Sequence, residues 1–531
     1  MKFLSVFFVL TIFFAGCGSS SSEPQKESKT NTTFTDNQNN TKEPTQSENS
    51  SLSSDNTIEE SGNAVITSEE VEDSLNQVKN DAENIVPIED TETTEIVTEP
   101  KISVQKEHSV TVYIHGYDDQ GTAYQNTYGY DAYDPMLNRL VELTGFDTLQ
   151  TYNPNNFTNV ITITPYYGQK APSYYTQKDI DEVEAVTHEY GGGIPRYALI
   201  IAKYAKHVMK ITGADHVNFI SASMGSLIAR WIIEKDVEHL ASEKKILRWQ
   251  TLEGVIRGNK LASDKDLVKF ANTIQEQPID VEQMSYQWIE QYLHNPREEA
   301  ASKYYKDIVI SEISSTKPGE PFDWLMLTTP NDGYQAVKDT YFETIRPEAR
   351  HNGQVPTHTF FHQTHLGLKK DDGAWANVAT FLLPHKRVQI TLTEAKVDDI
   401  HESYLNGSGE IVFESLVYSP YVEEIWSITD AISERVYDSG ALPVYKYKKD
   451  GQTKVVNQIL YDDYVLKDEN QLKLKLSAYE IDQNLKYGVH DGFGKYERLG
   501  SASLLIDLVD NTYTINARDW SGIVRVKIVG N

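Results

Sequence analysis

The chain has 531 residues, of which 78 are acidic and 49 are basic, so its formal net charge is −29. We do not expect nucleic acid as a partner, because phosphate binding needs clustered Lys and Arg, and no such cluster stands out. A single cysteine excludes a disulfide within the chain. The length is too great for one domain.

Residues 1–17 have the plan of a secretory signal. Lys2 precedes an apolar run, Phe3 to Ala15, that is too short to span a membrane. The run ends Phe14-Ala15-Gly16-Cys17-Gly18, which resembles the lipobox of bacterial lipoproteins. In that family the cysteine becomes the lipidated first residue. The resemblance implies that Cys17 anchors the protein in a bacterial cell envelope, at the outer membrane, on the periplasmic side or at the cell surface. A plain signal peptide with an incidental cysteine is the alternative.

Residues 18–106 are mostly Ser, Thr, Asn, Gln, Glu and Asp, with few aromatic side chains. Such a segment cannot bury enough apolar surface to fold. We therefore expect a disordered acidic tether that holds the folded part away from the bilayer.

In residues 107–385, short apolar runs alternate with helical patterns. This alternation predicts a mostly parallel sheet covered by helices, which is an α/β fold. The predicted strands are Val110–Ile114, Val160–Pro165, Val217–Ser221, Trp249–Val255 and Trp324–Leu327. The predicted helices are Pro135–Thr144, Arg196–Thr212, Met224–Lys235 and Trp375–Leu383. Residues 263–315 predict amphipathic helices without a strand, forming either a lid or a packed helical cap.

Ser223 lies where a predicted strand passes directly into a predicted helix. The small residues Ser221 and Gly225 flank it, which suits a turn where strand and helix come close. This setting resembles the turn on which an α/β-hydrolase presents a nucleophilic serine, although Ser221 stands where glycine is commoner. The alternative is an ordinary helix with Ser223 as its N-cap.

The first predicted strand ends His115-Gly116-Tyr117. A His-Gly step at this place is similar to the one with which lipases and esterases supply a backbone donor to the oxyanion. The resemblance implies an oxyanion hole formed by the amides of Tyr117 and Met224. Tyrosines crowd the stretch from Tyr117 to Tyr175, where they either line an acyl or aryl pocket or serve as packing.

The acid of a catalytic triad is expected after a late strand. Asp332 lies in the turn Asn331-Asp332-Gly333, after the predicted strand Trp324–Leu327 and before a loop rich in histidine. We expect Asp332 to be the acid. Glu253, near the end of the preceding strand, is its rival.

The segment Val355–Leu368 supplies the candidate bases, His358, His362 and His365. His365 lies deepest in the loop before the last helix, so we favour it, with His362 as the second candidate. The close spacing of the three histidines also allows a metal site, although no cysteine or carboxylate cluster joins them.

Ser223, Asp332 and His365 occur in the chain order typical of α/β-hydrolases. From Val110 to about Leu383 the chain resembles α/β-hydrolases of the lipase and esterase kind. The resemblance implies acyl transfer from an ester or lipid substrate through a Ser-His-Asp triad, with no cofactor required. A surface binding protein or adhesin with a non-catalytic hydrolase fold is the alternative.

Residues 386–531 alternate apolar and polar side chains between turn clusters, which predicts an antiparallel β-sandwich of about eight strands. The expected strands are Arg387–Lys396, Gly409–Tyr418, Tyr421–Thr429, Val444–Lys448, Lys454–Tyr461, Gln471–Tyr479, Ser501–Leu508 and Ile523–Val529. Acidic segments faintly resemble the calcium loops of C2 domains: Glu480-Ile481-Asp482, Asp491-Gly492, Glu497, Asp398 and Asp399. The resemblance implies a Ca²⁺ site, and loops that are merely acidic are the alternative.

Overall fold

The computed structural model describes residues 108–117, 126–132, 134, 136–156, 158–264, 278–294, 302–318, 330–400, 409–419, 431–436, 442–481 and 496–530. The expected signal segment, with Cys17, and the expected tether lie outside these residues. Within the described ranges, no helix is both long enough and apolar enough to cross a membrane.

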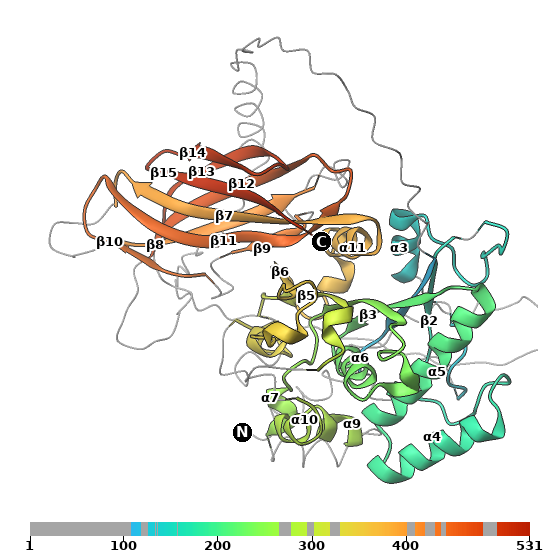
Figure 1. Ribbon diagram of the computed structural model, residues 1–531. Helices are drawn as coiled ribbons and strands as arrows, with labels where there is room; N and C mark the ends of the chain where they lie inside the picture. The colour runs from blue at the N-terminus through green and yellow to red at the C-terminus, as the bar shows by residue number, and fades with distance from the viewer. Residues whose placement is uncertain are drawn as a thin grey trace, which may run out of the picture. The chain divides into compact units, whose positions relative to one another are not determined.

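A parallel sheet forms the first part of the described chain (Figure 1). Its strands are β1 (Ser109–Ile114), β2 (Val160–Ile163), β3 (His216–Ala222), β4 (Ile246–Leu252), β5 (Val309–Ser315) and β6 (Thr357–Phe361). The strand order is β2-β1-β3-β4-β5-β6, and every neighbouring pair is parallel. After β1 the chain moves outward to β2 and then returns to the other side of β1 as β3. A crevice is expected at the carboxyl ends of β1 and β3, where the order reverses.

Helices cover both faces of this sheet. The α-helices are α3 (Met136–Thr144), α4 (Gln177–Tyr190), α5 (Ile194–Thr212), α6 (Met224–Glu234), α7 (Lys260–Ser263), α9 (Pro278–Gln283), α10 (Tyr286–Tyr292) and α11 (Asp372–Leu382). Short 3₁₀ turns are η1 (Val237–His239), η2 (Tyr305–Asp307), η3 (Val337–Asp339), η4 (Pro347–Ala349) and η5 (Leu368–Lys370). The insertion between β4 and β5 carries α7, α9 and α10.

Alternate residues of the strands enter two different cores. Val112 and Phe219 pack in the core that contains the apolar faces of α5 and α6. Tyr113 and Ile220, one position further along, pack in the core that contains α3 and α11. A parallel sheet buried on both faces in this way accounts for the nearly continuous apolar runs of β1 and β3.

Two antiparallel sheets follow. Their strands are β7 (His385–Val397), β8 (Gly409–Tyr418), β9 (Ser433–Arg435), β10 (Tyr445–Tyr447), β11 (Gln452–Leu466), β12 (Gln471–Ile481), β13 (Tyr496–Asp507), β14 (Asn511–Asn516) and β15 (Trp520–Val529). One sheet has the order β10-β8-β12-β13, with β9 on β8, and the other has the order β11-β7-β15-β14. Phe413 and Trp520, from opposite sheets, pack edge to face in the shared core. The predicted fold class, an α/β sheet followed by a β-sandwich, is confirmed.

The structure corrects several expected elements. Residues 263–315 were expected to lack a strand, but they contain β5, which lies between β4 and β6 in the sheet. Strand β6 lies inside the segment expected to be a histidine loop, and α4, β9 and β14 were not expected. Strand β4 ends at Leu252, three residues before the predicted end, because Glu253 has a φ of 45° and leaves the extended conformation. The predicted strands Trp324–Leu327 and Tyr421–Thr429 lie outside the described residues.

Candidate active site

Ser223 occupies the junction between β3 and α6 in a strained backbone conformation. Its φ of 52° and ψ of −124° are angles that a residue with a side chain rarely adopts. The turn is fixed on both sides: the Ser223 N–H donates to the Leu252 carbonyl at 2.9 Å, and the Ser223 carbonyl accepts from Val255 N–H at 3.0 Å. Ser223 is the N-cap residue of α6, and its carbonyl accepts the Ser226 N–H at 3.0 Å, but its side chain makes no capping hydrogen bond to the helix.

Two glycines make close contacts at this turn. A Cβ added to Gly225 would lie 2.3 Å from the Ile114 carbonyl oxygen, so only glycine lets α6 approach the end of β1. A Cβ added to Gly116 would lie 3.0 Å from the Cβ of Ser223 and 3.6 Å from its Oγ. The His115-Gly116-Tyr117 segment therefore lies directly beside the Ser223 hydroxyl.

Asp332 and His365 form a buried pair. His365 Nδ1 lies 2.7 Å from Asp332 Oδ2, and the His365 N–H donates to the Asp332 carbonyl at 3.0 Å. The other carboxylate oxygen of Asp332 accepts backbone N–H groups from Tyr334 at 2.9 Å and Gln335 at 2.6 Å. The structure thus brings together two residues that lie 33 positions apart in the sequence, and it fixes both the carboxylate and the imidazole.

Nearby charges determine the protonation of His365. Burial by itself would lower the pKa of the imidazole, but Asp332 and Glu253 raise it above its ordinary value. A histidine with a raised pKa and an oriented Nδ1–H can take a proton on Nε2 as a general base.

The other two histidines have different surroundings. His358 lies on β6, 2.7 Å from the Ser314 hydroxyl, and burial lowers its pKa to about 3. The His362 N–H donates to Glu434 at 2.8 Å, and its ring faces Thr316. Within the described residues, the cluster with metal-ligand spacing contains His365 but neither His358 nor His362. The three-histidine metal site is therefore not formed.

Glu253, the rival acid, lies in the same cluster. One ligand atom from each of Glu253, Asp332 and His365 falls within 4.8 Å of the other two. In the sequence Asp332 and Glu253 are alternatives, whereas the structure places both carboxylates beside one imidazole.

The loop expected to supply the oxyanion donor is held by Tyr166. The hydroxyl of this fully buried tyrosine lies 2.8 Å from the His115 carbonyl and 2.9 Å from the Gly116 carbonyl. The Tyr166 ring also stacks on His115, with the ring centroids 4.1 Å apart. Met224, the other expected donor, is the first residue of α6, and the first amides of a helix have no acceptor within the helix.

The tyrosines near this loop are mainly packing. Tyr128, Tyr166 and Tyr167 are at most 3% exposed and belong to the core on the α5 face. For these three side chains the packing alternative is correct. The positioning role of Tyr166 was not predicted, because no sequence pattern links it to the loop after β1.

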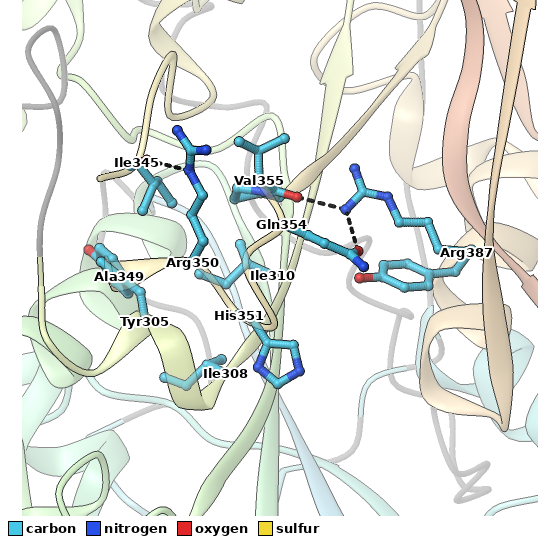
Figure 2. A pocket seen from close by; sticks show the side chains of 12 residues that line it. Tyr305, Ile308, Ile310, Ile345, Ala349, Arg350, His351, Gln354, Val355 and Arg387 are labelled. Carbon is cyan, nitrogen blue, oxygen red and sulfur yellow. Dashed lines mark hydrogen bonds between the residues drawn. The ribbon is translucent and has the colours of Figure 1, made fainter. Parts of the chain in front are cut away.

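A small cavity lies elsewhere, between residues that precede β6 and residues of β5, β7 and β11 (Figure 2). Arg387 crosses one side of it and donates to the Gln354 side chain at 3.1 Å and to the Val355 carbonyl at 2.8 Å. Its volume of about 20 Å³ suits a single water. None of the candidate catalytic residues lines it, so it is not a substrate pocket.

The acidic loops of the sandwich are described only in part. Asp398 pairs with Lys396, and the Asp398 N–H donates to the Asp519 carbonyl at 2.7 Å. Asp482 and Asp491 lie outside the described residues. The Ca²⁺ site stays a prediction.

Comparisons with known proteins give weak likenesses. No family model and no curated protein matches the chain. The mature form of the Bacillus licheniformis lipase BlEst2 is 13% identical, with a TM-score of 0.31 over 51% of this chain and 91% of that one. A metagenomic carboxyl esterase is 14% identical, with a TM-score of 0.28 over 52% of this chain and 71% of that one. A C2 domain of plant Extended Synaptotagmin 1 is 14% identical, with a TM-score of 0.17 over 28% of this chain and 97% of that one.

Likenesses at these TM-scores carry no inference about substrate or residue roles. The described chain itself has the strand order, the helices on both faces and the strand–turn–helix junction of its parallel sheet. Its fold is that of an α/β-hydrolase followed by an antiparallel β-sandwich.

Proposed function

We propose that this protein is a serine hydrolase that cleaves carboxylic esters. Ser223 is the nucleophile, His365 the general base and Asp332 the acid that orients it. The observation that carries the proposal is the buried 2.7 Å contact between His365 and Asp332. This pair lies beside Glu253. Glu253 directly follows Leu252, whose carbonyl accepts the Ser223 N–H.

The arrangement supports acyl transfer in two steps. Ser223 Oγ attacks the ester carbonyl and its proton passes to His365 Nε2, because Nδ1 faces Asp332. The amides of Tyr117 and Met224 stabilise the oxyanion, and the alkoxide leaves with the proton from His365. A water molecule then attacks the acyl-serine and gives a proton to His365, and His365 returns that proton to Ser223 Oγ as the bond to the acyl group breaks and the acid leaves.

The expected location favours lipid esters as substrates. We infer that Cys17 carries the acyl anchor and that residues 18–106 tether the hydrolase to a membrane of a bacterial envelope. Several acyl chains hold a protein stably at a bilayer, so the enzyme works beside ester-linked lipids.

A fluorophosphonate probe tests the nucleophile. The wild-type protein is expected to be labelled, and Ser223→Ala to lose both the label and a factor on the order of 10⁶ in kcat toward p-nitrophenyl esters. Ser242→Ala, at an exposed turn serine, serves as the matched control. A series of p-nitrophenyl esters of increasing chain length then defines the acyl preference. A folded wild-type protein without label would contradict the proposal and favour a binding protein.

A further inference from the structure

Glu253 is placed at the active site by an unusual backbone conformation. It follows β4 directly, and its φ of 45° lies in the left-handed region. Its N–H donates to the Ile313 carbonyl at 2.8 Å, which ties it to β5, and its side chain is fully buried. A strained non-glycine residue at the end of a strand, next to a strained nucleophile, indicates a functional constraint.

The Glu253 carboxylate is only half satisfied by hydrogen bonds. Oε2 accepts the Ser315 hydroxyl at 2.7 Å, whereas the buried Oε1 has no hydrogen-bond partner among the described residues. Asp332, in contrast, accepts two backbone N–H groups and contacts the imidazole. The two carboxylates therefore differ: Asp332 accepts two backbone N–H groups, whereas Glu253 accepts one hydroxyl and has the positive charges of His365 and Lys369 near it.

The charged groups that face Glu253 are His365, Asp332 and Lys369. Burial raises the pKa of Glu253 to about 7; the His365 and Lys369 charges and the Ser315 hydrogen bond oppose this rise, and Asp332 adds to it. Glu253 thus changes its charge in the pH range in which a histidine base titrates.

We propose that Glu253 is a second carboxylate for the His365 base, which supports the imidazolium together with Asp332 and partly replaces Asp332 when that acid is lost. Glu253 takes no proton from the substrate and acts through its charge alone. The proposal rests on the proposed hydrolase function, since it concerns the same base.

The pH profile of kcat/KM is the readout that a merely structural role would not change. In the wild-type enzyme, the acidic limb requires both deprotonation of His365 and ionisation of Glu253. Glu253→Gln removes a negative charge near His365, so the pKa of the base falls. The limb then moves to lower pH and becomes less steep, while kcat above pH 8 falls by roughly tenfold, as for one pKa unit of lost interaction.

Glu312→Gln is the matched control. Glu312 is a buried carboxyl on β5 that accepts the Phe342 N–H at 2.9 Å, and burial raises its pKa well above the ordinary value. It is not part of the cluster with His365. Its substitution should leave the pH profile unchanged, and a profile shifted equally by both substitutions would overturn the proposal.

Asp332→Asn tests the replacement with Glu253 still in place. Loss of the triad acid costs on the order of 10⁴ in kcat in a serine protease that depends on that acid. Here we expect Asp332→Asn to keep at least roughly tenfold more activity than the Asp332→Asn, Glu253→Gln double variant. Its residual rate should rise with pH as Glu253 ionises, at a lower pH than in the wild type, because loss of the Asp332 charge lowers the pKa of Glu253. Equal residual rates, or a rate independent of pH, would overturn the role of Glu253. A wild-type enzyme with neither label nor ester hydrolysis would instead overturn the hydrolase function itself.

Discussion

Two neighbouring strands end in residues whose backbone angles most side chains avoid. Ser223 after β3 and Glu253 after β4 both have left-handed φ values, 52° and 45°. Such conformations cost about 1–3 kcal/mol each and persist only where the surrounding structure enforces them. Here Leu252 and Ile313 accept their N–H groups. The strain directs two polar side chains to the same edge of the sheet.

The Tyr166 hydroxyl holds the backbone segment that contains one donor of the expected oxyanion hole. A trans peptide is planar, so holding the Gly116 carbonyl also fixes the direction of the Tyr117 N–H. Tyr166→Phe keeps the ring that stacks on His115 but removes this hold. We expect kcat for ester hydrolysis to fall by roughly tenfold to a hundredfold with little change in KM, measured by steady-state kinetics.

Tyr167→Phe is the control for this substitution, because Tyr167 is also buried and lies near His115. A rise in KM with an unchanged kcat in Tyr166→Phe would show that the hydroxyl does not position the oxyanion donor.

The β3–α6 junction accounts for the serine found where glycine is commoner. Ser221 Oγ accepts the indole N–H of Trp249 at 2.9 Å and lies 3.1 Å from Ser226 Oγ. Ser226 in turn donates to the Ser221 carbonyl at 3.0 Å. Ser221 and Ser226 therefore satisfy each other, in a fully buried polar cluster beside the nucleophile.

Ser221→Ala should destabilise the fold. The substitution leaves the buried indole N–H of Trp249 without its acceptor, at a cost of about 1–3 kcal/mol. Urea unfolding followed by tryptophan fluorescence measures the change, with the exposed Ser242→Ala as the control. An equal or higher unfolding midpoint for Ser221→Ala would contradict this account of the cluster.

Strand β5 was not predicted, because its sequence lacks a clear hydrophobic pattern. Its polar residues are buried: Ser311 accepts from Gln250, Glu312 accepts the Phe342 N–H, and Ser314 pairs with His358. A central strand whose side chains are satisfied by distant polar partners carries no period-two signal. Gly409–Tyr418 was predicted with its observed bounds because it is rich in apolar residues, of which Ile411, Phe413 and Val417 pack in one core.

At the scale of the whole molecule, the acidic chain contains a buried ion pair. Arg230 and Glu234 on α6 are at most 1% exposed in their side chains, and their Nε and Oε1 atoms lie 2.7 Å apart. Glu234 also accepts the His294 N–H at 2.9 Å, which links α6 to the chain after α10. Burial by itself would raise the pKa of Glu234, but Arg230 and His294 lower it to about 2.

This lowered pKa predicts a specific acid sensitivity. A carboxyl with a lower pKa in the folded state stabilises the fold above its unfolded pKa, about 4.3, and loses that contribution as the pH falls toward 2. Glu234→Gln leaves Arg230 buried without its partner and should cost about 3–5 kcal/mol at pH 7. The difference in unfolding free energy from wild type should shrink between pH 4.3 and 2, as followed by urea unfolding at each pH.

Glu243→Gln, at an exposed position after η1, is the control and should unfold like the wild type throughout. A difference between wild type and Glu234→Gln that is the same at pH 7 and pH 2.5 would contradict the lowered pKa.

The sequence by itself determined the parallel sheet, the sandwich after it and the order of Ser223, Asp332 and His365, because these depend on local periodicity and on positions at strand ends. The tertiary structure decided which side chains are neighbours in the site. In the sequence, Asp332 and Glu253 were rival candidates for the acid of the triad. In the structure, both carboxylates lie beside His365. Buried polar contacts between distant strands cannot be predicted from a local sequence pattern, because the two partners are far apart in the chain and meet only in the folded sheet.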